Sequence, residues 1–96
     1  MILGFLDREA PVFTYCPENI IVLPENNNNY AVVEWEEPNA TDTGSEPPIV
    51  SRTQGLASGS QFEQNQVHTI TYSAHDASGN YAENCEFTIQ VLGKMV

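Results

Sequence analysis

The chain has 96 residues, with 13 acidic and three basic side chains and a net charge of −10. A chain of this length forms one domain around a single core. Its charge repels nucleic-acid phosphates and anionic lipid surfaces, so we expect no nucleic-acid partner, and it attracts Ca²⁺ and basic protein surfaces. No apolar run is long enough to span a bilayer, so we expect no membrane insertion of this module.

The first residues are apolar, but they do not resemble a secretion signal. Residues 1–6 lack a basic segment and are followed at once by Asp7. We expect residues 1–9 to be a linker or an edge strand, residues 10–92 to be the folded domain and residues 93–96 to be a tail. We also expect the sequence to be a piece excised from a longer chain.

Strand signals dominate the first half of the domain. Residues 20–23 are a short apolar run, and residues 26–29 are four asparagines that predict a polar turn. Residues 30–35 alternate between apolar and polar side chains, which predicts a half-buried strand. Its predicted inward face holds Ala31, Val33 and Trp35.

The middle of the chain reads as irregular structure. Residues 37–48 are rich in Pro, Asn, Thr, Asp, Gly and Ser, which predicts a loop and not a helix. Residues 49–53 are predicted to be a short strand, and residues 55–60 a flexible turn.

Two further strands are predicted at residues 67–74 and 81–91. The inward face is predicted to hold Ile70, Tyr72, Ala74, Cys85, Phe87, Ile89 and Val91. We assign His68 to the opposite, solvent-facing side. Helical periodicity is absent from the sequence, and several short strands at about ten-residue spacing predict an all-β fold, either a sandwich or a small barrel.

The stretch HDASGNYAENC, residues 75–85, contains residue types found in active sites. A hairpin loop explains it better, because Asp76 can accept a backbone N–H and Gly79 can adopt a positive φ. A Ser–His–Asp relay through His75 and Ser78 is geometrically poor, because adjacent strand residues point to opposite faces. We therefore predict a turn, no catalytic residues and no enzyme activity.

The two cysteines, Cys16 and Cys85, are either a disulfide or two free thiols. Small size, few lysines and an N-glycosylation acceptor at Asn39 together favour an oxidising, extracytoplasmic setting, and hence the disulfide. Reactive thiols are the alternative, although Cys85 lies on a predicted inward face where a thiolate is disfavoured.

Three motifs carry a family resemblance. They are Cys-Pro-Glu-Asn-Ile at residues 16–20, Trp-Glu-Glu-Pro at 35–38 and Asp-Ala-Ser-Gly-Asn at 76–80. In this order and spacing, residues 10–92 resemble the HYR (hyalin repeat) module, an extracellular domain. The resemblance implies an antiparallel β-sandwich of immunoglobulin-like or fibronectin III-like type and supports the Cys16–Cys85 disulfide.

The same resemblance implies a non-catalytic role in cell adhesion and protein–protein interaction. The module would belong to a larger secreted or cell-surface protein, located outside the cell. Its partners would be extracellular proteins or neighbouring modules of the same chain. The resemblance assigns no contact residues.

Two alternatives stay open. A calcium-dependent binding module would draw on four carboxylates, namely Glu36, Glu37, Asp42 and Asp76. Calcium requires six or more converging oxygens, and a solvated acidic face gives the same composition. An accessory domain of a secreted enzyme is the other alternative, on fold analogy alone. Apart from Ca²⁺, we expect no cofactor.

Overall fold

Eight β-strands make up the regular structure of the computed structural model, which describes residues 9–44 and 46–93. They are β1 (Val12–Tyr15), β2 (Ile20–Val22), β3 (Tyr30–Val33), β4 (Asn39–Thr41), β5 (Ile49–Gln54), β6 (Ser60–Glu63), β7 (Gln66–His75) and β8 (Cys85–Val91). None of the described segments is a helix that could cross a membrane. The predictions for residues 1–8 and 94–96 lie outside the described residues.

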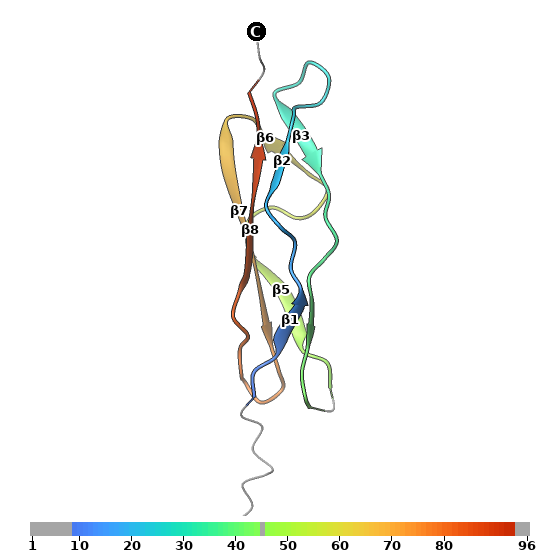
Figure 1. The fold of residues 1–96 in the computed structure, drawn as a ribbon, viewed down its shortest axis with the longest axis vertical. Helices are drawn as coiled ribbons and strands as arrows, with labels where there is room; N and C mark the ends of the chain where they lie inside the picture. Colours follow the sequence, from blue (N-terminus) through green and yellow to red (C-terminus); the bar gives the residue numbers. More distant parts are fainter. Residues whose placement is uncertain (1–8, 45, 94–96) are drawn as a thin grey trace, which may run out of the picture.

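The strands form two layers, as Figure 1 shows. One layer is a four-stranded sheet in the order β2-β8-β7-β5, and the other consists of the pairs β3–β6 and β1–β4. Because β3 leads into β4 along the chain, these two pairs follow one another along the length of the second layer (Figure 1). The predicted all-β, immunoglobulin-like sandwich is confirmed.

One strand pair departs from the predicted antiparallel arrangement. Strand β2 runs parallel to β8, with Ile20 opposite Ile89. Between β1 and β2, Pro17 has no N–H to donate and interrupts strand pairing. Next to it, the Asn19 side chain links this segment to β8, since its Oδ1 accepts the backbone N–H of Thr88 at 2.8 Å. The chain therefore changes layers without reversing direction, and β2 runs the same way as β8.

The core lies between the layers and contains the predicted inward residues. The side chains of Ile70, Tyr72, Ala74, Phe87, Ile89 and Val91 are each at most 2% exposed. Trp35 covers one side of this core, with its ring centroid 5.9 Å from that of Phe62 and 5.3 Å from that of Phe87. Burial of these large apolar side chains is the main stabilising contribution to the fold.

The strand predicted for residues 30–35 ends two residues early, at Val33. Beyond it, the Ser58 hydroxyl replaces a partner strand. Its Oγ accepts the Trp35 N–H at 2.8 Å and donates to the Trp35 carbonyl at 3.1 Å. The indole is thus held on the core face without a continuous ladder.

Three strands were not predicted. Strand β4 lies inside the segment predicted to be a loop at residues 37–48, so that prediction is wrong for Asn39–Thr41. Strands β1 and β6 were also missed. Strands β1 and β4 each have a single half-buried side chain, and β6 has two inward side chains, Ser60 and Phe62, of which only Phe62 is large and apolar. So few apolar inward side chains give no period-two pattern to detect.

The assignment of His68 to the solvent side is wrong. Residues two apart on a strand share a face, so His68 lies on the same side as Ile70 and Tyr72. Its ring stands edge-on to Phe62, with centroids 5.1 Å apart, and its Nε2 donates to the Glu63 carbonyl at 3.0 Å. The histidine extends the aromatic core toward one end of the sandwich.

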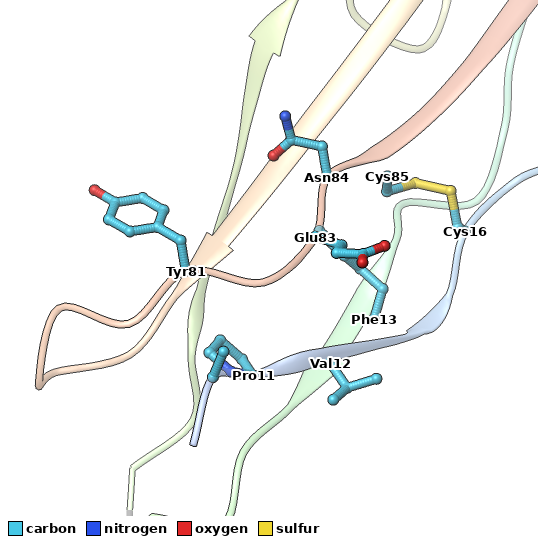
Figure 2. A pocket seen from close by; sticks show the side chains of 9 residues that line it. Pro11, Val12, Phe13, Cys16, Tyr81, Glu83, Asn84 and Cys85 are labelled. Atoms are coloured by element: carbon cyan, nitrogen blue, oxygen red, sulfur yellow. A yellow bond between two sulfur atoms is a disulfide. The ribbon is translucent and has the colours of Figure 1, made fainter. Parts of the chain in front are cut away.

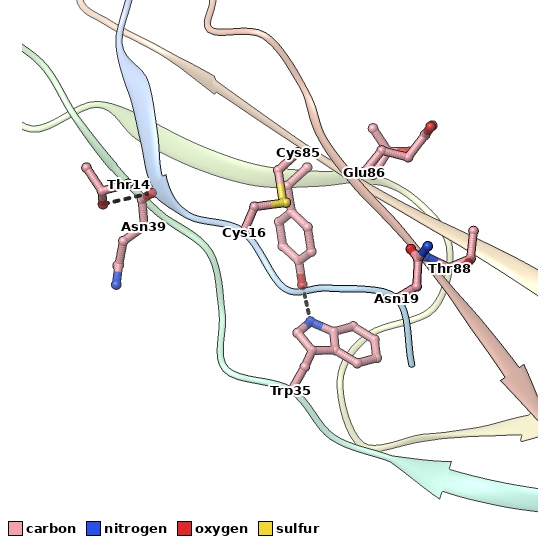
Figure 3. Close-up of a disulfide and its surroundings, with 10 residues drawn as sticks. Thr14, Cys16, Asn19, Trp35, Asn39, Cys85, Glu86 and Thr88 are labelled. Carbon is pink, nitrogen blue, oxygen red and sulfur yellow. Dashed lines mark hydrogen bonds between the residues drawn. A yellow bond between two sulfur atoms is a disulfide. The ribbon is translucent and has the colours of Figure 1, made fainter. Parts of the chain in front are cut away.

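The predicted disulfide joins Cys16, just after β1, to Cys85 at the start of β8 (Figure 3). The Cα atoms are 5.7 Å apart, and the bond closes a loop with a sequence separation of 69 residues. On the chain-entropy description, a loop of this length stabilises the folded state by about 4 kcal/mol. The disulfide ties the two layers together where β1 passes into β2.

Candidate functional site

The turn at residues 76–80 is built around the carboxylate of Asp76. Its Oδ1 accepts the backbone N–H groups of Ser78 at 3.0 Å and Asn80 at 2.8 Å, and its Oδ2 accepts the Asn80 side-chain amide at 3.0 Å. Gly79 adopts a φ of 88°, as the turn requires. The hairpin-loop prediction is confirmed, and the side chains of Asp76 and Asn80 stabilise the turn.

The environment of Asp76 also sets its acidity. Its side chain is only 4% exposed. Burial raises the pKa of this carboxyl group, but the hydrogen bonds from Asn80 and Ser78 outweigh burial and leave the pKa below its ordinary value. Asp76 is therefore charged at neutral pH, and its charge holds the turn.

Two of the four predicted calcium ligands lie together. An interaction with the Asp42 side chain adds to the lowering of the Asp76 pKa, which places these two side chains near each other. Asp42 Oδ1 accepts the Thr43 N–H at 2.9 Å, whereas its Oδ2 is buried with no hydrogen-bond donor among the described residues. Two carboxyl groups this close favour a shared proton or a bound cation over two adjacent negative charges.

The other two predicted ligands do not join this pair. Glu37 accepts the Tyr72 hydroxyl, with distances of 3.0 and 3.1 Å to its two oxygens. Glu36 is exposed. Within the described part of the chain, no group of three or more His, Cys, Asp or Glu side chains is placed to hold a metal ion.

The N-glycosylation acceptor Asn39 lies on β4 and not in the exposed loop that the sequence predicted. Its side chain is exposed, and its backbone pairs with Tyr15 of β1. The Thr14 hydroxyl donates to the backbone carbonyl of Asn39 at 3.3 Å, so this hydrogen bond does not occupy the side-chain amide. Access to the amide is therefore kept in the folded domain.

A groove that the sequence did not predict runs beside the disulfide (Figure 2). It has a volume of about 540 Å³, is open to solvent and is mostly apolar. Pro11, Val12 and Phe13 come from one side, and Tyr81 and Glu83 from the other (Figure 2). Val12 is 63% exposed and Tyr81 is 64% exposed.

A β-bulge shapes one side of this groove. Residues 81–84 were predicted to be part of a strand, but regular pairing begins only at Cys85, opposite Tyr72. The next paired residues toward the turn are His75 and Tyr81, so residues 82–84 lie opposite only residues 73–74. The extra residue breaks the alternation and leaves Glu83 and Asn84 both exposed, next to the groove.

The only signal of this groove in the sequence was weak. Glu83 and Asn84 are consecutive polar residues inside an otherwise alternating segment, which is one mark of a bulge. Nothing local indicates that β1 approaches this segment. That approach depends on the disulfide and on the change of layers at Pro17.

Comparisons with known proteins agree with this fold. The HYR domain model matches residues 6–91. Hyalin of Strongylocentrotus purpuratus is 37% identical over 90 residues, covering 94% of this chain and 7% of hyalin. Sushi, von Willebrand factor type A, EGF and pentraxin domain-containing protein 1 of Rattus norvegicus is 36% identical over 86 residues, covering 90% of this chain and 2% of that protein. No solved structure gives a significant match.

Both relatives are much longer than this chain. The chain spans less than a tenth of either relative, so in both proteins the matching region is one domain of a much larger whole. The sandwich, the Cys16–Cys85 disulfide and the match over residues 6–91 agree with one another. The chain belongs to the HYR domain family.

Proposed function

We propose that the chain is a non-catalytic extracellular module that mediates adhesion and protein–protein interaction within a larger protein. The observation that carries this proposal is the disulfide-pinned sandwich of a family whose members here are small parts of long, multidomain chains. A stable disulfide suits a secreted or cell-surface location, because the cytosol keeps thiols reduced. A glycan on the exposed Asn39 side chain fits the same location.

The proposal is tested by retention on extracellular matrix. The chain, biotinylated at one terminus and assembled on streptavidin as a fluorescent tetramer, is applied to decellularised matrix. Saturable retention that untagged folded chain competes away is the expected result, because multivalency raises weak module affinities into a measurable range. The reduced and alkylated chain is the control. Absence of saturable retention would contradict the proposal.

A calcium-dependent binding module is the second candidate, and the contact between Asp42 and Asp76 favours it. A Ca²⁺ ion would remove the repulsion between the two carboxylates and fill the place of the missing donor at Asp42 Oδ2. The remaining oxygens would have to come from water or from a neighbouring module. The accessory-domain alternative depends on the modules that flank this one in its parent protein.

Titration with Ca²⁺, followed by NMR amide shifts, separates these functions. Saturable shifts at residues 42–43 and 76–80 that Asp42→Asn abolishes would support a calcium site. The matched control is Glu36→Gln, which removes a charge from an exposed carboxylate. Weak shifts that are spread over all acidic residues and are equal in both variants would mean that Ca²⁺ only screens the acidic surface, and would contradict a calcium site.

A further inference from the structure

We propose that the groove between β1 and the 82–84 bulge binds an extended, basic segment of a partner protein. The segment would place an apolar side chain against Pro11, Phe13 and Tyr81, and a Lys or Arg side chain beside Glu83. The proposal rests on the proposed function, because it names the surface and the partner chemistry through which the module would act.

The shape of the groove favours a chain segment over a compact small molecule. Its volume of about 540 Å³ holds more than one side chain, but it is open along one side. Strand β1 pairs with β4 along one edge only, so the other edge keeps backbone N–H and C=O groups without a strand partner among the described residues. An extended segment uses such an edge for main-chain hydrogen bonds and the apolar groove for its side chains.

The acidic side chains around the groove determine which charge a binding segment should carry. Glu83 lies in the groove, and Asp42 lines an adjoining hollow that shares Ala10 and Val12 with it. Among the described residues that line the two hollows there is no Lys, Arg or His. Charge complementarity therefore favours a basic segment.

The same charge disfavours a second copy of this chain as the occupant. Each copy carries a net charge of −10. Arg52 is the only Lys or Arg among the described residues; it lies on β5 and donates to the Gly55 carbonyl at 3.0 Å. Two copies joined at the groove would bring acidic rims together, and none of the described residues that line the rims is a base that could offset them.

The test uses the ¹⁵N-labelled chain and the blocked peptide acetyl-Lys-Arg-Phe-Pro-Lys-amide at physiological salt. We expect saturable amide shifts confined to residues 10–16 and 81–85. Two control peptides are matched to it, one with Glu in place of each base and one with Ala in place of Phe and Pro. Both are expected to bind at least about tenfold more weakly, since each lacks one of the two proposed contacts.

Two variants separate a local contact from general attraction. Glu83→Lys is expected to weaken the peptide about tenfold or more, because it replaces attraction with repulsion at the rim. Glu34→Lys makes the same charge change at an exposed residue that does not line the groove, and it is expected to change affinity less than about twofold. Equal weakening by both variants would overturn the proposal, as would binding of the Ala peptide at full strength. Shifts at residues 10–16 that depend on chain concentration without peptide would assign the groove to a second copy and also overturn it.

The matrix assay keeps this proposal apart from the proposed function. Retention that is lost in Glu83→Lys and kept in Glu34→Lys supports the groove as the contact surface. Retention kept in both variants overturns the groove and leaves the adhesive function standing. If the wild-type tetramer is not retained at all, the adhesive function is refuted. The peptide titration alone then decides whether the groove binds a basic segment.

Discussion

At the scale of single residues, the Tyr72 hydroxyl links β7 to the segment that follows β3. It accepts the Trp35 indole N–H at 3.1 Å, drawn as a dashed line in Figure 3, and donates to Glu37. Burial raises the pKa of Tyr72, the Trp35 hydrogen bond acts against this, and the negative charge of Glu37 adds to it. The phenol therefore stays protonated and can donate to Glu37 across the neutral range.

Replacement of Tyr72 by Phe removes both hydrogen bonds and leaves the ring in place. We expect a loss of about 1–3 kcal/mol in the free energy of unfolding, because the indole N–H and the Glu37 carboxylate lose a partner. Urea denaturation measures the change. Tyr81→Phe is the matched control, since Tyr81 is 64% exposed, and it is expected to stay within about 0.5 kcal/mol of wild type. Equal stability of the two variants would show that the Tyr72 hydroxyl contributes nothing.

The charge of Asp76 makes the free energy of unfolding depend on pH in the acidic range. Its folded pKa lies below the ordinary value, so its contribution is present above the pKa of the unfolded chain and is lost as pH falls through the folded pKa. We expect Asp76→Asn to be less stable than wild type at pH 7, and the difference to shrink below about pH 4. Free energies of unfolding from pH 7 to about pH 2.5 test this, with the exposed Glu36→Gln as control. A difference that does not change with pH would refute the role of the charge.

At the scale of elements, the local sequence pattern predicts the long strands but not the short ones. Strands β7 and β8 were predicted with their inward faces, because seven or more residues contain several repeats of a period-two pattern. Strands β1, β4 and β6 were not predicted, since each has three or four residues and at most one large apolar inward side chain, which is too little for a period-two pattern to stand out from a loop. The motif resemblance to the HYR family predicted the sandwich that these short strands alone could not.

The candidate sites divide along the same line. The turn around Asp76 was predictable, because the hydrogen bonds from Ser78 and Asn80 to the Asp76 carboxylate join residues within four positions of one another. The sequence named Asp42 and Asp76 among four candidate carboxylates but could not show that these two lie together, and it did not predict the groove, because each feature joins segments distant in sequence. The groove further depends on a one-residue bulge, which shifts register without changing composition.

Two glycines in the β5–β6 connection allow an element-scale prediction with an internal control. Gly55 and Gly59 have φ values of 92° and 91°. A Cβ on Gly55 would lie 2.5 Å from the Thr69 carbonyl oxygen of β7, whereas one on Gly59 would meet nothing within 4 Å. Both variants to Ala therefore carry the same backbone strain, and only Gly55→Ala adds a clash.

We expect Gly59→Ala to cost about 1 kcal/mol, from left-handed backbone strain alone. Gly55→Ala is expected to cost roughly 2–4 kcal/mol, because overpacking against β7 adds to that strain. Thermal and urea unfolding of the two variants measure the difference. Equal destabilisation would mean that the connection shifts away from β7 freely, and that its packing there contributes little.

At the scale of the whole molecule, the disulfide compensates for a small core and a repulsive surface. A domain of this size has a net stability of about 5–15 kcal/mol. The net charge of −10 acts against the compact state through self-repulsion, and much of the second layer consists of strands of three or four residues. A contribution of about 4 kcal/mol from the Cys16–Cys85 bond is therefore a large share of the total.

Removal of the bond by the double change Cys16→Ala and Cys85→Ala is expected to lower the free energy of unfolding by roughly 2–5 kcal/mol. High salt should stabilise both forms and leave the difference between them nearly unchanged, because the two carry the same net charge and the bond acts through the chain entropy of the unfolded state. Urea denaturation at low and high salt measures both effects. A mass increase on alkylation only after reduction first establishes that the wild-type thiols are paired. A double variant as stable as wild type would mean that the sandwich does not need the bond, and the disulfide would then no longer support the extracellular location proposed above.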